Sequence, residues 1–204
     1  MKLNKATAGD TASLLLETGL SARAEIGLTG DDQLHVKVSP NGSSWFEALS
    51  IAQATGVVSL PIGQLAFPAT QNPSANANTL DDYEEGTWTP AVTFGGAAVG
   101  VTYGSPSTGR YTKIGRLVIA TGSLTLTSTG SSTAAAQITG LPFTALNDTI
   151  LNAVAVGFAS GFTSVTGAVI GLVQPNVNRV TLYQSANGAA TGLSNAHFTN
   201  TSAV

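Results

Sequence analysis

The chain has 204 residues, of which only 9% are charged, and its formal net charge is -3. This weak negative charge excludes the strongly basic surface of a nucleic-acid-binding protein. The absence of cysteine excludes disulfides, zinc-thiolate sites and thiol nucleophiles. No run reaches about 18 apolar residues, and the first residues lack the apolar core of a secretory signal. We therefore expect synthesis in the cytoplasm and no membrane insertion.

The composition favours an all-β fold. Gly, Ser, Thr, Ala, Asn and Val dominate, a mixture that suits short strands joined by small-residue turns. From residue 117 to the end of the sequence, Asp148 and Arg179 are the only charged side chains. So neutral a surface promotes association, and we expect a homo-oligomer.

Residues 1–60 alternate apolar runs with turn signals. Strands are expected at 13–17, 22–28, 33–39 and 45–51. Residues 34–38 alternate most regularly, with one face formed by Leu and two Val and the other by His and Lys, which is typical of a strand buried on one side. Asn41-Gly42 predicts a tight hairpin turn that pairs the last two strands. These strands cannot bury a core alone, so the segment is expected to trimerise or dock on a partner.

Residues 61–86 are rich in Pro, Gly and Asn and are expected to form an extended linker and hinge. Residues 87–204 are expected to form a β-sandwich, jelly-roll-like head, because many short apolar segments follow one another with small-residue turns. The expected strands lie at 91–94, 99–103, 109–114, 117–127, 134–139, 150–158, 166–173, 177–184 and 196–199.

A recognisable pattern lies at the start of this head. The runs LDDYEEGTWTP at 80–90, VTY at 101–103, GRYTKIGR at 109–116 and ITGLPF at 138–143 resemble the beginning of the C-terminal head of fibre and spike proteins of tailed phages and prophages. Before the hinge, NKAT at 4–7, RAEIGL at 23–28, LHVKVSPNG at 34–42 and WFEA at 45–48 are similar to a segment of fibre and spike proteins of prophages and gene transfer agents of alphaproteobacteria.

This resemblance implies an intertwined homotrimeric appendage of a virion, whose β-rich head touches bacterial surface polysaccharide. It implies further that a virion protein anchors the chain through its N-terminal segment. The resemblance extends to about residue 143, and the last third of the chain carries no matching motif.

The carboxylates of the hinge could bind a metal or supply the acid pair of a glycoside hydrolase. They lie close together in sequence, at Asp81, Asp82, Glu84 and Glu85. We therefore prefer an ion-pairing cluster with Arg110, Lys113 or Arg116 as partners. Trp88 is interpreted as a core anchor rather than a sugar platform. The basic run 110–116 could touch acidic polysaccharide but fits an exposed hairpin strand equally well.

Receptor binding is expected in the distal part of the head, because sugars are recognised by aromatic faces together with amides and charges. Those side-chain types gather in an otherwise polar-poor region, at Asn176, Asn178, Arg179, Tyr183, Gln184, Asn195, His197 and Phe198. No nucleophile elbow, phosphate-cradling glycine loop or metalloprotease motif occurs. We expect neither catalytic residues nor a cofactor or metal.

The resulting hypothesis is a non-enzymatic fibre or spike that attaches a phage-like particle to host polysaccharide. Two alternatives stay open at this stage: a polysaccharide depolymerase tailspike and a purely structural virion decoration protein.

Overall fold

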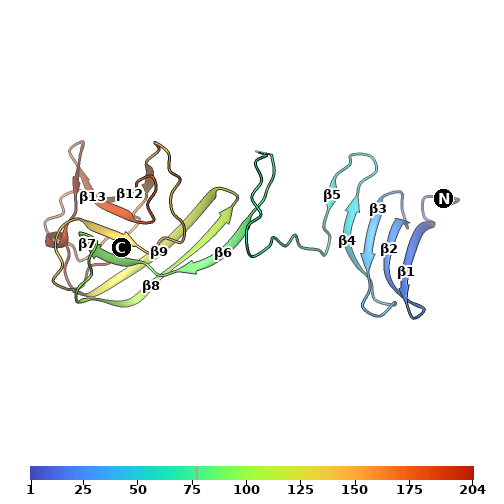
Figure 1. Ribbon diagram of the computed structural model, residues 1–204, viewed down its shortest axis with the longest axis horizontal. Helices are drawn as coiled ribbons and strands as arrows, with labels where there is room; N and C mark the ends of the chain where they lie inside the picture. The colour runs from blue at the N-terminus through green and yellow to red at the C-terminus, as the bar shows by residue number, and fades with distance from the viewer. Residues whose placement is uncertain (77) are drawn as a thin grey trace. The chain divides into compact units, whose positions relative to one another are not determined.

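The computed structural model describes residues 1–76 and 78–204, and residue 77, inside the expected linker, lies outside the described residues. The contacts between residues divide the chain into two compact units, Met1–Ala66 and Phe67–Val204. Both consist of antiparallel β-sheets (Figure 1), which confirms the predicted all-β fold. Among the described residues, the single helical element is the short 3-10 turn η1, Asn195–His197. No helix in the described part of the chain is long and apolar enough to cross a membrane.

The first unit is one five-stranded antiparallel meander, in which the strands lie side by side in chain order (Figure 1). Its strands are β1 (Thr11–Thr18), β2 (Ser21–Thr29), β3 (Leu34–Val38), β4 (Phe46–Ile51) and β5 (Val58–Ser59). The predicted hairpin around Asn41-Gly42 is confirmed, since β3 pairs with β4. The Asn41 side-chain oxygen accepts hydrogen bonds from the backbone N–H groups of Ser43 and Ser44, and Gly42 has a φ of 81°.

The burial of β3 is the reverse of what its alternation suggested. Leu34 and Val38 are 37% and 44% exposed, whereas His35, on the opposite face, is 7% exposed. The imidazole of His35 is covered because it lies between two carboxylates, those of Asp31 and Glu47. The apolar face of the strand has no layer packed on it within this unit.

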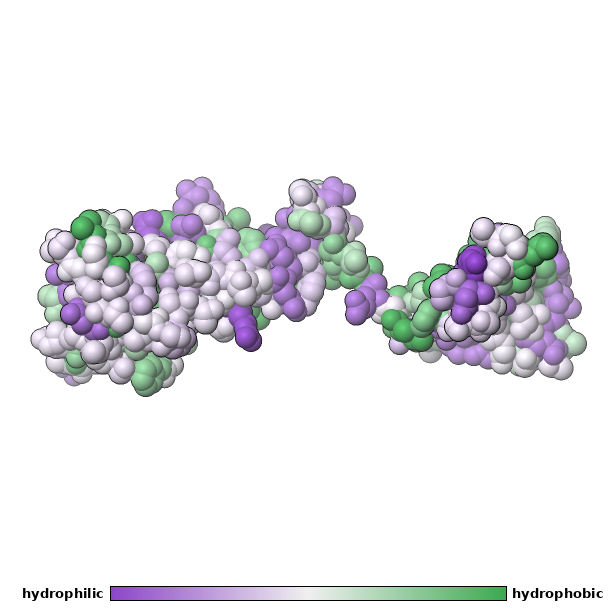
Figure 2. All heavy atoms as spheres, turned by 90° about the horizontal axis from the view of Figure 1, so that it is seen from below, coloured by the Kyte–Doolittle hydropathy of each residue, from purple (hydrophilic) through white to green (hydrophobic). Residues whose placement is uncertain are grey.

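That uncovered face extends across β1 to β4. The register places Leu14, Ile26, Val36 and Leu49 in one cross-strand row. A second row holds Leu16, Ala24, Val38 and Phe46. Leu14, Leu16, Ile26, Val38 and Phe46 are each more than 40% exposed, and hydrophobic side chains reach the surface of this unit in Figure 2. We call these two rows the apolar sheet face.

Residues 60–82, apart from residue 77, contain no helix or strand. Regular structure then starts with β6 (Tyr83–Trp88), so the C-terminal part of the sequence expected to be hinge belongs to a sheet. β6 pairs with β8 (Val101–Ile114), and β8 pairs with β9 (Leu117–Thr129). The expected break around Pro106 does not interrupt β8, which passes through it with shifts of register between Thr102 and Ser107.

The other sheet of the second unit has the strand order β11-β12-β13-β10-β7, with β14 paired to β13. Its strands are β7 (Ala91–Phe94), β10 (Ala136–Thr139), β11 (Asn152–Val154), β12 (Ala168–Val173), β13 (Val180–Ala186) and β14 (Ala189–Gly192). Asn187-Gly188 forms the β13–β14 turn with positive φ at both residues, as an Asn-Gly hairpin requires. The jelly-roll-like arrangement stays a prediction.

Two expected strands of this unit differ from the structure. Residues 150–158 contain only the three-residue β11, because only Asn152–Val154 pair with residues of β12. Residues 196–199 were expected to be a strand, and instead the chain turns in η1. There Ser194 and His197 bond reciprocally in a capping box, which favours a helical turn over an extended chain.

The core of the second unit is shared by its two sheets. Leu124 and Leu126 of β9 pack with Phe94, Leu182 and Leu193, all about 1% exposed or less. Trp88 packs against the edge of this core, and its indole N–H donates to the Thr121 carbonyl oxygen over 3.0 Å. The interpretation of Trp88 as a core anchor is therefore confirmed.

Candidate functional site

The eight residues expected to bind a receptor are spread over the six-stranded sheet and its connections, with Tyr183 and Gln184 inside β13. Val180 pairs with Ile138, which places Asn176, Asn178 and Arg179 near the Thr139 end of β10. At the opposite end, the Asn195 side-chain oxygen accepts a hydrogen bond from the Ala134 N–H. Strand β10, Ala136–Thr139, separates these two places. The candidates therefore do not form one site.

Four of the eight hold the fold together. Phe198 is 6% exposed, and its ring meets the rings of Phe94 and Phe162 edge to face, at centroid distances of 5.2 Å and 4.7 Å. The imidazole Nδ1 of His197 accepts a hydrogen bond from the Ser194 N–H over 3.1 Å. Asn195 bonds Ala134, as above, and the Gln184 side-chain oxygen accepts from the Thr166 N–H over 2.9 Å. These contacts give the four side chains structural roles in the fold.

Asn176, Asn178 and Arg179 belong to the connection between β12 and β13. Asn176 has a φ of 57°, a conformation that Asn tolerates better than most residues, so it has a structural role in the turn. Two backbone hydrogen bonds fix this connection: the Asn176 N–H donates to the Ala145 carbonyl oxygen, and the Ala145 N–H donates to the Val177 carbonyl oxygen. Asn178 is exposed and Arg179 is half-buried, so both remain available to a ligand.

Tyr183 is a half-buried aromatic candidate on the outer face of the sheet. Leu182, its neighbour on β13, points into the core at 0% exposure, so Tyr183 points to the outer face of the sheet. On that face Gly192 of β14 pairs directly with Tyr183, and Ile170 of β12 pairs with it on the other side. We call Ile170, Tyr183, Ser185 and Gly192 the tyrosine platform.

Gly192 leaves the side of Tyr183 that faces β14 uncovered. A Cβ added at Gly192 would meet no atom within 4 Å, and the residue does not need positive φ. Neither backbone conformation nor packing therefore requires glycine at this strand position. Gly192 is the last residue of β14, and a glycine in a sheet can mark a place where a ligand approaches closely. The sequence alone does not single out this glycine, because its significance depends on Tyr183 across the ladder.

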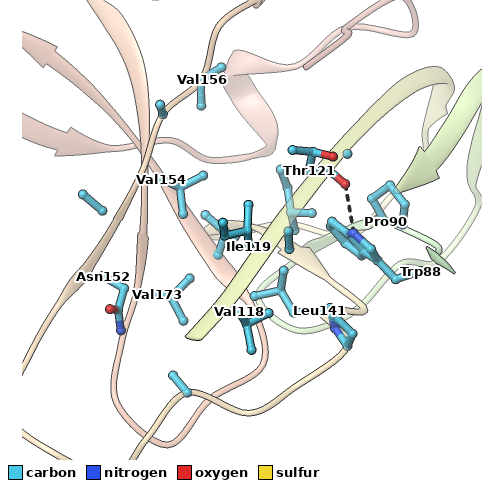
Figure 3. A pocket seen from close by; sticks show the side chains of 18 of the residues that line it. Trp88, Pro90, Val118, Ile119, Thr121, Leu141, Asn152, Val154, Val156 and Val173 are labelled. Atoms are coloured by element: carbon cyan, nitrogen blue, oxygen red, sulfur yellow. Dashed lines mark hydrogen bonds between the residues drawn. The ribbon is translucent and has the colours of Figure 1, made fainter. Parts of the chain in front are cut away.

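A large apolar cleft lies elsewhere in the same unit, between β9 and residues 141–158. Its volume is about 1100 Å³, and core residues such as Val173 and Leu182 form part of its lining. Figure 3 shows the side chains of Val118 and Ile119 between Trp88 on one side and Val154 and Val173 on the other. Charged side chains contribute to the lining only through Arg116 and Asp148. The sequence alone does not predict this cleft, because its walls come from segments far apart in the chain.

The hinge carboxylates are engaged in structural contacts. Asp82, which is 5% exposed, pairs with Lys113, so the predicted ion pair is confirmed for this residue. Tyr111 donates a hydrogen bond to Glu84, and Tyr83 donates one to Glu85. The Asp81 carboxylate accepts the Ser74 N–H over 2.8 Å, and this bond lowers the pKa of Asp81. Within the described residues, no group of three or more His, Cys, Asp and Glu side chains could hold a metal ion.

In the first unit, two carboxylates contact His35. Its Nε2 lies 2.7 Å from an Asp31 carboxylate oxygen, and its Nδ1 donates to Glu47. Ionised carboxylates only accept hydrogen bonds, so this arrangement favours the protonated ring, in which both nitrogens donate. Burial opposes that charge, but the hydrogen bonds and charges of the two carboxylates outweigh burial and raise the pKa of His35. The same contact holds the pKa of Asp31 well below its usual range.

Comparison with known proteins gives no relative. No protein-family model, no curated protein and no solved structure matches this chain.

Proposed function

We propose that this protein is a fibre or spike subunit that attaches a phage or phage-like particle, such as a gene transfer agent, to the host cell surface by binding polysaccharide without catalysis. In this proposal it is made in the host cytoplasm and exposed on the virion as a homotrimer. Its N-terminal unit docks on a virion anchoring protein, and its C-terminal head meets the glycan. The resemblance at residues 80–143 and at 4–48 motivates the proposal.

The observation that carries the binding part is the pairing of Tyr183 with Gly192. An aromatic ring stacks on the apolar face of a pyranose, and nearby hydroxyl groups bond the sugar's own hydroxyls. The tyrosine platform offers both, because Ser185 lies on the same face two residues from Tyr183 and Gly192 leaves space beside the ring. A single shallow contact of this kind is weak, and three copies on one particle would multiply it through effective concentration.

The apolar sheet face supports the assembly part. Five large apolar side chains that are more than 40% exposed on one sheet are a liability for a lone chain in water. Contact with other copies, or with the anchoring protein, removes that surface from water and gains about 25 cal/mol for each Å² buried.

The depolymerase alternative needs two free carboxylates on either side of a glycosidic bond. The second unit contains Asp81, Asp82, Glu84, Glu85 and Asp148 as its acids. The first four make the contacts described above, and Asp148 accepts the Ile150 N–H over 2.9 Å. These structural engagements favour binding over hydrolysis. The other alternative is a decoration protein without a receptor, and a binding measurement distinguishes it from an attachment protein.

The test is binding of the purified protein to an array of bacterial capsular and lipopolysaccharide O-antigen glycans. We expect wild-type protein to bind at least one polysaccharide and Tyr183→Ala to bind it about 10-fold more weakly, which corresponds to about 1.4 kcal/mol. Gly192→Val should weaken binding as strongly, because its side chain covers the ring without straining the strand. Incubation with the bound polysaccharide should release no new reducing ends.

Tyr83→Ala is the matched control, since Tyr83 is a 44% exposed tyrosine on β6 outside the tyrosine platform. It should bind like wild type. Absence of binding to every polysaccharide and to host cells would contradict the attachment function. Equal loss of binding in Tyr183→Ala and Tyr83→Ala would contradict the assignment of the tyrosine platform.

A further inference from the structure

We infer that Asn187, in the turn between β13 and β14, is a site of spontaneous deamidation, at which its side-chain amide is converted to a carboxylate without an enzyme. The reaction needs only this chain and water. It concerns a turn of the second unit that has no part in the tyrosine platform itself.

An Asn followed by Gly supplies both reacting groups. The Gly188 backbone nitrogen loses its proton to hydroxide and attacks the side-chain amide carbon of Asn187. A bond forms between that nitrogen and Cγ, the bond between Cγ and Nδ2 breaks, and ammonia leaves with a proton taken from water. Water then opens the five-membered imide at either carbonyl carbon and gives aspartate or isoaspartate. Glycine favours the attack because it has no side chain beside the nitrogen and its backbone is conformationally permissive.

The other Asn-Gly pair of the chain, Asn41-Gly42, is held by hydrogen bonds. The Asn41 side-chain oxygen accepts the N–H groups of Ser43 and Ser44, over 3.0 Å and 2.8 Å. The Gly42 N–H, which would be the nucleophile, donates to the Ser39 hydroxyl oxygen over 2.8 Å. Ser39 is only 6% exposed, so water competes poorly for that bond. These bonds must break before an imide ring can close at residue 41.

No such contacts hold Asn187 and Gly188. Among the described residues, no hydrogen bond engages the Asn187 side chain or the Gly188 N–H. In this two-residue hairpin the flanking Ala186 and Ala189 pair with each other, which leaves the N–H groups of the turn outside the ladder. Both turn residues are exposed, and a Cβ added at Gly188 would meet no atom within 4 Å. The amide, its nucleophile and water can therefore meet at this site.

Deamidation would change the charge of a nearly uncharged surface. From residue 117 to the end of the sequence, Asp148 and Arg179 are the only charged side chains, and their charges cancel. A carboxylate at residue 187 leaves this part of the chain with one uncompensated negative charge. Such a charge repels an acidic polysaccharide that approaches the head.

Isoaspartate would also lengthen the turn, because the backbone then passes through the Cβ of residue 187. The length of a hairpin loop sets the register of its two strands. Every residue of β14 is exposed, and among the described strands β14 pairs only with β13. The position of Gly192 opposite Tyr183 therefore depends on this turn. We expect isoaspartate to displace β14 and weaken glycan binding, a consequence that rests on the proposed function.

Peptide mass spectrometry of the folded protein, incubated at mildly alkaline pH, tests the assignment. Trypsin cleaves after Lys37 and Arg179, so Asn41 and Asn187 lie in different peptides. We expect the acidic products to form at least about 10-fold faster at Asn187 than at Asn41, a barrier difference of about 1.4 kcal/mol, because the bonds at Asn41 must break first. In protein unfolded with urea, the two sites should react at similar rates. Equal rates in the folded protein, or no product at Asn187, would overturn the inference.

Two variants separate the reacting groups from the rest of the fold. Ser39→Ala removes the acceptor of the Gly42 N–H, so it should speed the reaction at Asn41 and leave the rate at Asn187 unchanged. Asn187→Gly removes the amide and keeps a residue that tolerates the positive φ of 51°, so the slow appearance of an acidic form in ion-exchange chromatography should cease. An acidic form that still accumulates in Asn187→Gly would contradict the assignment.

Polysaccharide binding, measured before and after the incubation, distinguishes this inference from the proposed function. Wild-type protein should lose affinity as residue 187 deamidates, whereas Asn187→Gly should keep it. Deamidation in a protein that binds no polysaccharide and no host cell would support the modification site and reject attachment. Binding that survives complete deamidation would reject the effect on the tyrosine platform and leave both the attachment function and the modification site standing.

Discussion

The packing of Trp88 on two glycines gives the sharpest prediction about the stability of the second unit. Trp88 pairs with Gly109 on β8, and Gly109 pairs with Gly122 on β9. A Cβ added at Gly109 would lie 2.2 Å from the Trp88 Nε1, and one added at Gly122 would lie 2.8 Å from its Cζ2. The indole ring therefore occupies the space that side chains at these two positions would need.

The cost of Gly109→Ala follows from that distance. Carbon atoms in good contact are about 3.5–4.0 Å apart, so the ring must move by more than about 1 Å. Such overpacking costs about 1–3 kcal/mol, and the lost hydrogen bond to Thr121 about 0.5–1.5 kcal/mol. Replacing glycine by alanine recovers about 0.4–1 kcal/mol by restricting the unfolded chain. The net loss of unfolding free energy is about 2–3 kcal/mol, or about 10 °C in melting temperature for a unit of this size.

Thermal and urea unfolding followed by circular dichroism would measure this loss, and a shift in Trp88 fluorescence should accompany it. Gly104→Ala is the matched control on the same strand, because its added Cβ would lie 3.4 Å from Thr127 Cγ2, an ordinary contact. It should change the unfolding free energy by less than about 1 kcal/mol. In a Trp88→Ala background, Gly109→Ala should become harmless, a coupling of about 2–3 kcal/mol. Equal stabilities for Gly109→Ala and Gly104→Ala would refute the packing argument.

Three further predictions concern other parts of the fold. Because folding raises the pKa of His35, its ion pairs stabilise the first unit fully below pH 6.5, the ordinary pKa of histidine, and this stabilisation is lost as pH rises through the raised pKa. Trp45 fluorescence, followed during unfolding of a Trp88→Phe variant at several pH values, should show this loss of stability. A His35→Gln variant with the same pH dependence would contradict the role of His35. Lys113→Met leaves the buried Asp82 carboxylate without its cation and should lower the unfolding free energy, measured with urea, by about 3 kcal/mol. The double variant Lys113→Met, Asp82→Asn should recover much of this free energy. No recovery would mean that the charges of the pair do not cause the loss. Phe198→Ala should lower the unfolding free energy by about 3–5 kcal/mol, because it removes a buried ring that packs on Phe94 and Phe162 and leaves a cavity, whereas the exposed Asn178→Ala should change it by less than about 0.5 kcal/mol. Similar values for the two variants would reject the core role of Phe198.

The sequence identified features that depend on a few neighbouring residues. Small-residue composition and frequent turn signals indicated an all-β chain, and the structure has sheets in both units. Asn41-Gly42 marked a hairpin because the turn chemistry is local. Asn187-Gly188 carried the same signal, yet the strand after it was not predicted, since its Ala-Ala-Thr-Gly sequence shows no apolar alternation.

Features that depend on distant residues were decided only by the tertiary structure. Alternation in residues 34–38 separates two faces but cannot say which is covered, and Asp31 and Glu47 cover the His35 face. The local sequence does not show that Phe198 meets Phe94 and Phe162, or that Gly192 lies beside Tyr183. The hinge is a further example. In the sequence, residues 80–90 mark a boundary between two segments, but only the pairing with β8 shows that Tyr83–Trp88 form strand β6. Sequence patterns fix which side chains share a face, whereas long-range pairing fixes what each face meets.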